Sequence, residues 1–351
     1  MRLALYIGRR FLFLIPQVFL ISFITFVLVR LLPGDPARLS LGPLAPESSV
    51  EALRAKMYLD RPIPEQYVIW LENAFQGDLG ASWVNNTEVI DDLVQRIPVT
   101  LELIFLSLLV VFLVLVPLAI ITASRTRNWI VRIFQNITFG YGMLAGALPD
   151  FLLGLVLIFF LFAGAAGLMP AEILPGPEGR LGILDFEPPF VTGSILIDSL
   201  IAGDMEIFWS GLMHLIMPVF TLSFVYGAPI FKMLRSQMEG ALKADYTTYA
   251  EAVGLAPTIV LTRAARVAAG PTLVITGVVV MFLLGGAVLV ERVFNYVGLG
   301  QYAINGIVTA DYAPIQGFVC FAAIFTMLVY LAVDLIHFAM DPRIKIGGTQ
   351  A

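Results

Sequence analysis

Long apolar runs separated by polar stretches dominate the pattern of this chain. The first run, residues 11–32, has 22 residues. At about 1.5 Å per residue, a helix of that length crosses a hydrocarbon core of about 30 Å. It is too long for the apolar region of a secretory signal, about 7–15 residues, so we expect a retained first membrane span. Five further apolar segments predict five more spans: Val99–Ala123, Ile133–Gly167, Phe208–Phe231, Thr272–Val290 and Ile315–Met340.

Prolines interrupt several of these segments. Pro149, in "GALPDFLLG", predicts a break in the segment 133–167, which is long enough for a tilted span or for a span preceded by an interfacial turn. Pro117, Pro218 and Pro229 lie inside other segments, where neighbouring helices or waters must satisfy the carbonyls that proline frees. The prolines therefore favour a packed bundle.

Lysines and arginines are unequally distributed between the segments that join the spans. With the N-terminus in the cytoplasm, 13 of them fall on that side and 7 on the other. The positive-inside rule then places both termini inside. We therefore predict an all-α integral membrane protein, a six-span helical bundle with cytoplasmic N- and C-termini. Its expected parts are a basic N-terminus with the first span (1–32), an extracytoplasmic helical loop (33–97) and a five-span core (98–351) whose largest cytoplasmic loop is 232–270.

The predicted outer loop 33–97 is acidic but has helical signals. Ser48 and Glu51 have the spacing of a capping box, and a second helix is predicted from Pro64 to Gly77. Its apolar stripe indicates either a helix that lies on the membrane surface or a docking surface for an outside partner. The stripe consists of Tyr67, Trp70, Leu71 and Phe75.

Composition and charge exclude several classes of protein. The chain is 59% hydrophobic and 13% charged, with a net charge of −5, which argues against a nucleic-acid partner. It has no G-x-x-x-x-G-K-[ST] motif, no H-E-x-x-H and a single cysteine, Cys320, which we interpret as a packed core residue. Ionisable residues near the spans fall close to their ends and indicate snorkelling or helix capping rather than ion coupling. They are Glu102, Glu291, Arg292, Asp334 and His337.

The loop 232–270 carries its own helix signals. Asp245 is suited to cap a helix that runs through Ala252 and ends at Gly254, and a second helix is predicted to start near Pro257. Tyr246, Ala250 and Val253 or Gly254 share a face at helical spacing, whose small residues would let a partner's groove approach closely. Thr248 and Glu251 fall on the other side. From these residues alone, the segment is either an amphipathic connector or a docking element.

Resemblance to a known family favours the second interpretation. "DYTTYAEAVGLAP", followed by "ARVAAGPTLVITG", resembles the EAA loop of ABC-importer permeases, which docks on a cytosolic ATPase. Other segments resemble the oligopeptide/dipeptide and nickel branch of that family, in the same order: "LLPGDPA", "YLDRPIPEQYVIWLENAFQGDLGASW", "RIPVTLEL", "ALPDFLLGL", "VERVFNYVGLGQYAINGI", "DYAPIQG" and "MDPRIK". The resemblance implies that the ATPase-coupling positions are Asp245, Tyr246, Ala250, Glu251, Ala252 and Gly254.

Two departures from the family pattern stand out. Where the family commonly has a His and an "RN" pair, this chain has Ala264 and the pair Arg266–Val267. The segment 168–207 is also long, with "GPEGRLGILDFEPPF" before the fourth span.

The resemblance implies a permease subunit that forms half of a translocation pathway for short peptides, not an enzyme. The implied partners are a second permease, two cytosolic P-loop ATPases that bind ATP and Mg²⁺, and an extracytoplasmic substrate-binding protein. The implied location is a prokaryotic cytoplasmic membrane. This chain itself is expected to hold no cofactor or metal. Nickel complexes, glutathione or opines are alternative cargoes; a self-contained channel or secondary transporter, or a membrane scaffold, are alternatives of a different class.

Overall fold

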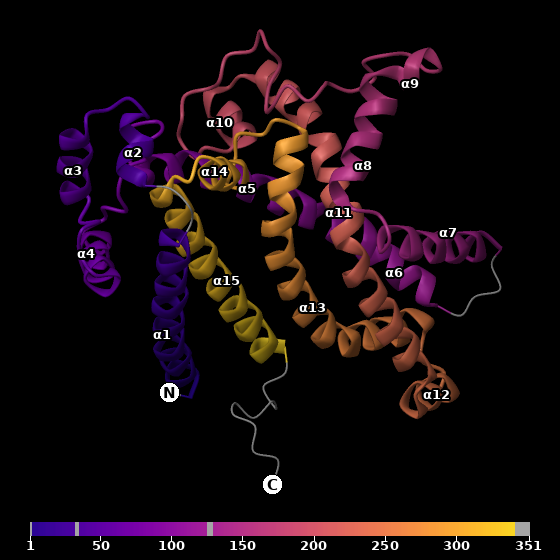
Figure 1. Cartoon of the computed structure of the whole chain (residues 1–351). Coiled ribbons are helices and arrows are strands. Elements are labelled where there is room, and N and C mark those ends of the chain that lie inside the picture. The colour runs from indigo at the N-terminus through magenta and orange to yellow at the C-terminus, as the bar shows by residue number, and fades with distance from the viewer. Residues whose placement is uncertain (1, 32–34, 125–128, 341–351) are drawn as a thin grey trace. The chain divides into compact units, whose positions relative to one another are not determined.

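The structure, a computed structural model, describes residues 2–31, 35–124 and 129–340. Within these ranges every regular element is helical, apart from one isolated β-bridge between Ala81 and Glu88. The chain divides into two compact units, whose helices are labelled in Figure 1. Unit 1 comprises residues 1–99 and 297–328, and unit 2 comprises residues 100–296 and 329–351.

Unit 1 contains the N-terminal helix and a group of short helices. Tyr67 of α4 shares a hydrogen bond of 2.8 Å between its hydroxyl and that of Ser22 of α1, and its ring lies 5.3 Å from that of Phe26, centroid to centroid. The apolar stripe of α4 therefore packs on α1 through Tyr67 and Trp70, whereas Phe75 at its end is 75% exposed. The helices within this unit are α1 (Arg2–Arg30), α2 (Pro36–Leu41), α3 (Glu47–Lys56), α4 (Ile63–Phe75) and α14 (Leu299–Val308).

The predicted capping box at Ser48 is wrong. Helix α3 begins at Glu47 and its N-cap is Pro46, which offers no side-chain hydrogen bond. Ser48 is therefore already inside the first turn and cannot occupy the capping position. The second predicted helix does form as α4, which begins one residue before Pro64 and ends at Phe75.

Unit 2 holds most of the long apolar helices. Two continuous helical segments, α5 (Val89–Val110) and α15 (Tyr312–Met340), pass from one unit into the other. The remaining elements are the π-helical turn η1 (Val111–Leu115), α6 (Val116–Ala123), α7 (Trp129–Ala145), α8 (Asp150–Leu157), the π-helical turn η2 (Ile158–Phe162), α9 (Gly164–Gly167), α10 (Ile195–Ala202), α11 (Met205–Lys243), α12 (Asp245–Ala252) and α13 (Pro257–Val293).

Four helices in the described part of the chain are long and apolar enough to cross a membrane. They are Val89–Ala123, Met205–Lys243, Pro257–Val293 and Tyr312–Met340. A bent pair, α7 with α8 and η2, would make a fifth span. In the region of the predicted first span, the apolar stretch Ile15–Arg30 lies within the longer helix α1, and the count of six spans stays a prediction.

Prolines act in two ways. The chain bends by 113° between α7 and the following helix, at a break that contains Pro149, as the sequence predicted. Pro117 instead lies at the start of α6, directly after the π-helical turn η1, and the helix continues through it. A π-helical turn shifts the hydrogen-bond register, so a proline without its N–H is accommodated without a break.

Three helices of unit 2 meet in a close polar contact. Tyr226 of α11 donates a hydrogen bond of 2.8 Å to Asp150, the first residue of α8. A Cβ atom on Gly286 of α13 would lie 2.0 Å from the same Tyr226 hydroxyl. The absence of a side chain at Gly286 therefore lets α11 present its tyrosine to α8.

Candidate functional site

The predicted docking loop forms a short helix at the end of two long ones. Helices α11 and α13 pack along each other, and α12 lies at the end where α11 stops and α13 begins (Figure 1). The eight residues of α12 thus lie between the 39-residue helix α11 and the 37-residue helix α13. The loop is consequently not a loose connector.

The two ends of α12 test the local predictions. Its N-cap is Ala244, and Asp245 lies in the first turn without capping the helix, so the predicted Asp245 cap is wrong. A carboxylate in the first turn is still favourable, because it faces the positive end of the helix dipole. The C-terminal prediction is confirmed, since Gly254 has a φ of 80° just after the helix.

Backbone hydrogen bonds explain why glycine stands at 254. Leu255 N–H donates to the Ala250 carbonyl at 3.1 Å and Gly254 N–H to the Glu251 carbonyl at 3.0 Å. This pair of bonds is the Schellman motif, which requires a left-handed residue after the helix. The chain then enters α13 at Pro257, as predicted, with Ala256 as N-cap.

Side-chain contacts fasten α12 to its own chain. The Thr247 hydroxyl donates a 2.7 Å hydrogen bond to the carbonyl of Ala241 near the end of α11. Ala250 is only 6% exposed. The expectation that Ala250 belongs to an open docking face is therefore wrong, because the neighbouring α11 and α13 cover that side of α12.

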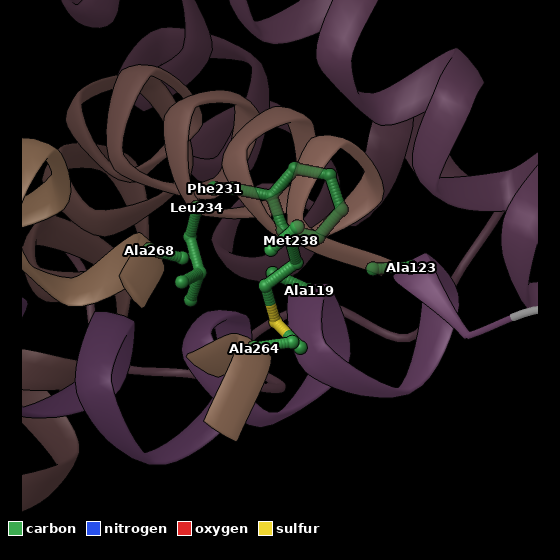
Figure 2. Close-up of a cluster of buried hydrophobic side chains, with 8 residues drawn as sticks. Ala119, Ala123, Phe231, Leu234, Met238, Ala264 and Ala268 are labelled. Carbon is green, nitrogen blue, oxygen red and sulfur yellow. The ribbon is translucent and has the colours of Figure 1, made fainter. Parts of the chain in front are cut away.

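An alanine-rich cluster joins the ends of α6, α11 and α13 next to this helix (Figure 2). Small side chains let helix backbones approach closely, and the larger side chains fill the space between them. Met238 and Ala268 are fully buried here. The buried members are Ala119, Ala123, Phe231, Leu234, Met238, Ala241, Ala264 and Ala268.

The exposed face of α12 is aromatic and apolar. Tyr249 is 71% exposed, Val253 56% and Tyr246 49%, and their spacing of three and four residues places them along one side. Of the positions implied by the resemblance, Asp245, Glu251 and Ala252 are also exposed. The structure thus brings the implied positions together on one short helix and divides them into a buried support and an exposed surface.

Cations flank this surface at the start of α13. Arg263 and Arg266 line a shallow cavity of about 250 Å³ together with Thr258, Ile259 and Thr262. Within the described part of the chain, neither arginine has an ion-pair partner. The first turns of α13 therefore carry two exposed cations, whereas α12 itself carries the exposed carboxylates Asp245 and Glu251.

Sequence reasoning missed Tyr249 and the two arginines as site residues. Tyr246, Tyr249 and Val253 could have been found as an apolar stripe at helical spacing, whereas the position of Arg263 beside α12 depends on the turn at Gly254. Ala264, which stands where the family commonly has a histidine, is 1% exposed and belongs to the buried cluster. That position is thus a packing position in this chain.

A second polar site lies elsewhere in unit 2 and organises the segment before α11. Glu102 of α5 accepts hydrogen bonds from the Ser194 hydroxyl at 2.5 Å and from the backbone N–H of Leu196 at 3.2 Å. Arg180 lies 3.4 Å from the same carboxylate and donates to the Gly193 carbonyl at 2.7 Å. Glu102 therefore anchors the start of α10 from inside α5, instead of snorkelling at a span end or capping its own helix.

Asp198 secures the same end of α10. Its carboxylate accepts hydrogen bonds from the Thr192 side chain and from the backbone N–H groups of Thr192, Val191 and Gly193. Burial alone would raise the pKa of Asp198, but these hydrogen bonds together outweigh it and hold the pKa below its usual value. The turn 191–193 is thus stabilised by a charged carboxylate.

Glu291 differs from the expectation of a boundary residue. Its side chain is fully buried and accepts a hydrogen bond of 2.5 Å from the Thr100 hydroxyl.

Among the described residues, no group of three His, Cys, Asp or Glu side chains is placed to hold a metal ion.

Residues 115–346 match the family described as binding-protein-dependent transport system inner membrane component, and residues 3–104 match the N-terminal region of such membrane components. The chain belongs to this family of transport permease subunits, which confirms the resemblance. It is a permease subunit rather than an enzyme.

Relatives match along almost the whole length. The chain is 37% identical to a probable D,D-dipeptide transport system permease protein of Escherichia coli strain K12, over 93% of both chains. It is 34% identical to a di/tripeptide transport system permease protein of Pseudomonas aeruginosa, over 97% of this chain and 98% of the relative. A glutathione transport system permease protein of Escherichia coli is 31% identical, over 97% and 98% of the two chains.

Proposed function

We propose that this chain forms half of the translocation pathway of an ATP-driven importer for short peptides in a prokaryotic cytoplasmic membrane. The other half is a second, similar permease, and an extracytoplasmic binding protein delivers the peptide. Two cytosolic P-loop ATPases bind ATP and Mg²⁺. The near full-length similarity to permeases named for dipeptides and di/tripeptides supports this cargo.

In this proposal both termini lie in the cytoplasm and the chain crosses the membrane six times. The apolar helix at the N-terminus is the first span, and the bent pair α7 and α8 is the third. The parts are residues 1–32, an extracytoplasmic helical loop 33–97, and a core 98–351 with its cytoplasmic loop at 232–270. The charge bias toward the cytoplasmic loops supports this topology.

The single observation that carries the coupling proposal is the exposed stripe of α12. Tyrosine and arginine are the residues that most often dominate protein interfaces, and here Tyr246, Tyr249 and the nearby Arg263 are open. A partner that fits has an apolar groove with an acidic rim. The coupling set is therefore Asp245, Tyr246, Glu251 and Ala252 on the surface, Ala250 as buried support and Gly254 as the turn that ends the helix.

Force on α12 would reach the spans through the alanine-rich cluster. The Thr247 hydrogen bond and buried Ala250 tie the helix to α11, and the cluster ties α11 to α6 and α13. Close-packed cores deform little, so the ends of α6, α11 and α13 that meet in the cluster would move together. ATP-driven closure of the ATPases would thereby open the pathway alternately to the two sides of the membrane.

The test is the variant Tyr249→Ala, purified with its co-expressed ATPase chains in mild detergent. Loss of an interface tyrosine costs about 2 kcal/mol, or about 30-fold in affinity, so most of the ATPase should no longer co-purify. Tyr249 is 71% exposed, so its loss should change the melting temperature of the permease little. Tyr330→Ala on α15, which is also exposed, serves as the matched control. Equal retention of the ATPase by both variants would refute the docking role of α12.

A separate assay addresses the cargo. Proteoliposomes with the complete importer and its binding protein should accumulate labelled dialanine on addition of ATP. Unlabelled D,D-dipeptide, glutathione and nickel–histidine are the competitors. Competition by glutathione alone, without competition by any dipeptide, would contradict the peptide assignment and leave the docking proposal intact.

A further inference from the structure

A cavity of about 680 Å³ lies between α7 and α11, apart from the docking surface of α12. One wall is formed by Thr138 and Gly142 of α7 with Gly146 in the turn that follows, and the other is a face of α11 that carries Lys232, Arg235 and Glu239. Both helices belong to unit 2. The cavity therefore combines two cations and one anion with a wall of small residues.

The two cations differ in how they are satisfied. Arg235 donates from Nε to Glu239 at 2.9 Å and from Nη1 to the Thr138 hydroxyl at 3.2 Å, which fixes its guanidinium against α7. Lys232, one turn earlier on the same helix, has neither an ion pair nor a hydrogen bond within the part of the chain that the structure describes. Its ammonium is therefore the uncompensated charge of the cavity.

Two glycines, one in α7 and one just after it, leave the space that the Lys232 side chain occupies. A Cβ on Gly142 would lie 3.1 Å from Lys232 Cε, and a Cβ on Gly146 would lie 3.4 Å from Lys232 Nζ. The aliphatic part of the lysine thus lies along the glycine face of α7. A larger side chain at Gly142 would displace the ammonium from the cavity.

The surroundings of the cavity are apolar and open. Phe139 and Met143, which also line it, are 66% and 65% exposed. Because the chain bends by 113° after α7, this helix runs across the direction of α8 rather than in line with it. The proposed topology places the side of α7 that carries Phe139 and Met143 at the boundary between headgroups and acyl chains, as the first part of the bent third span.

We propose that the α7–α11 cavity binds the headgroup of an anionic phospholipid. The phosphate lies at Lys232, with the Arg235–Thr138 pair beside it, and the acyl chains lie against Phe139 and Met143. Basic cavities between membrane helices on the cytoplasmic side are suited to such headgroups. The assignment to the inner leaflet rests on the proposed topology, in which the end of α11 that carries α12 is cytoplasmic. Lys232 lies in the half of α11 nearer to that end.

The experiment uses the full-length chain, delipidated in detergent and titrated with short-chain phosphatidylglycerol or phosphatidylcholine. Binding is counted by native mass spectrometry. The native chain should retain one tightly bound phosphatidylglycerol and no comparable phosphatidylcholine. Lys232→Gln should weaken phosphatidylglycerol binding about fivefold, which corresponds to about 1 kcal/mol. Gly142→Leu, which fills the glycine face without changing the charge, should weaken it at least as much.

Lys243→Gln is the matched control, because Lys243 is an exposed lysine on the same helix outside the cavity. It should leave phosphatidylglycerol binding unchanged. If Lys243→Gln and Lys232→Gln weaken binding equally, the attraction is a general surface effect and the site is refuted. Displacement of the lipid by inorganic phosphate at millimolar concentration would show an anion site without lipid preference, and would also overturn the assignment.

Discussion

Removal of the Glu102 carboxylate should loosen α10 while the long helices stay folded. In the variant Glu102→Ala the Ser194 hydroxyl and the backbone N–H groups of Ile195 and Leu196 lose their acceptor. These donors lie at the N-terminus of α10, where no carbonyl within the helix can replace the carboxylate. The segment 191–202 is therefore the part of the molecule that should respond.

The magnitude follows from the geometry. Breaking a buried ion pair by removing one partner costs about 3–5 kcal/mol. Arg180 keeps its hydrogen bond to the Gly193 carbonyl and is 15% exposed at its side chain, so the lower value applies. A cost of about 3 kcal/mol raises the population of the locally open segment about 100-fold. Glu102→Gln, which keeps the shape and some acceptor capacity, should have a smaller effect.

Amide hydrogen exchange read by mass spectrometry is the suitable assay, because it reports local opening in detergent. Peptides that cover 191–202 should exchange about 100-fold faster in Glu102→Ala, whereas peptides of α13 should not change. Glu178→Ala is the matched control, since Glu178 is an exposed carboxylate in the longer segment 168–207 but outside residues 191–202. If exchange in the two variants agrees within about threefold, the anchoring role of Glu102 is wrong.

Two further predictions concern a glycine pair and acidification. Gly286→Ala should lower the thermal stability by about 1–3 kcal/mol, because the new Cβ would lie 2.0 Å from the Tyr226 hydroxyl. Gly285→Ala, with nothing within 4 Å, should leave stability unchanged or raise it by up to about 1 kcal/mol, and equal melting temperatures would contradict this packing. Because the folded pKa of Asp198 is depressed, its stabilisation is present above the unfolded pKa of about 3.9 and is lost as the pH falls below it. Limited proteolysis at 191–193 should accordingly accelerate below about pH 4 in the native chain, and an Asp198→Asn variant should be susceptible at neutral pH already.

Local rules predicted the elements of the loop 232–270 well. Gly254 ends α12 and Pro257 starts α13 because a left-handed turn and a fixed φ are properties of single residues. The start of α12 was predicted less well, since the difference between Ala244 and Asp245 as N-cap depends on the direction of the chain as it leaves α11. Apolar length likewise predicted the long helices, though not how far α11 and α13 extend past the apolar segments.

The sequence did not predict which face of a helix is covered or which distant residues contact each other. Helical spacing placed Ala250 with Tyr246, but which side of α12 is covered depends on α11 and α13. Glu291 was expected at a boundary, although its partner Thr100 is 191 residues away in the sequence. Tyr67 was expected on an open surface, and its contact with Ser22 joins residues 45 apart. Such contacts belong to the tertiary arrangement, and spacing along one helix carries no information about them.

The length of α11 and α13 has a consequence for any protein that binds α12. At about 1.5 Å per residue these helices reach about 55–58 Å, whereas a bilayer with its headgroups is about 40–45 Å thick. In the proposed topology this surplus would place α12 beyond the lipid, on helical extensions that belong to this chain. A soluble partner can therefore reach Tyr249 without displacing lipid or entering the headgroup layer. Its affinity should then depend on the salt concentration through Arg263 and Arg266, and hardly at all on the lipid composition of the membrane.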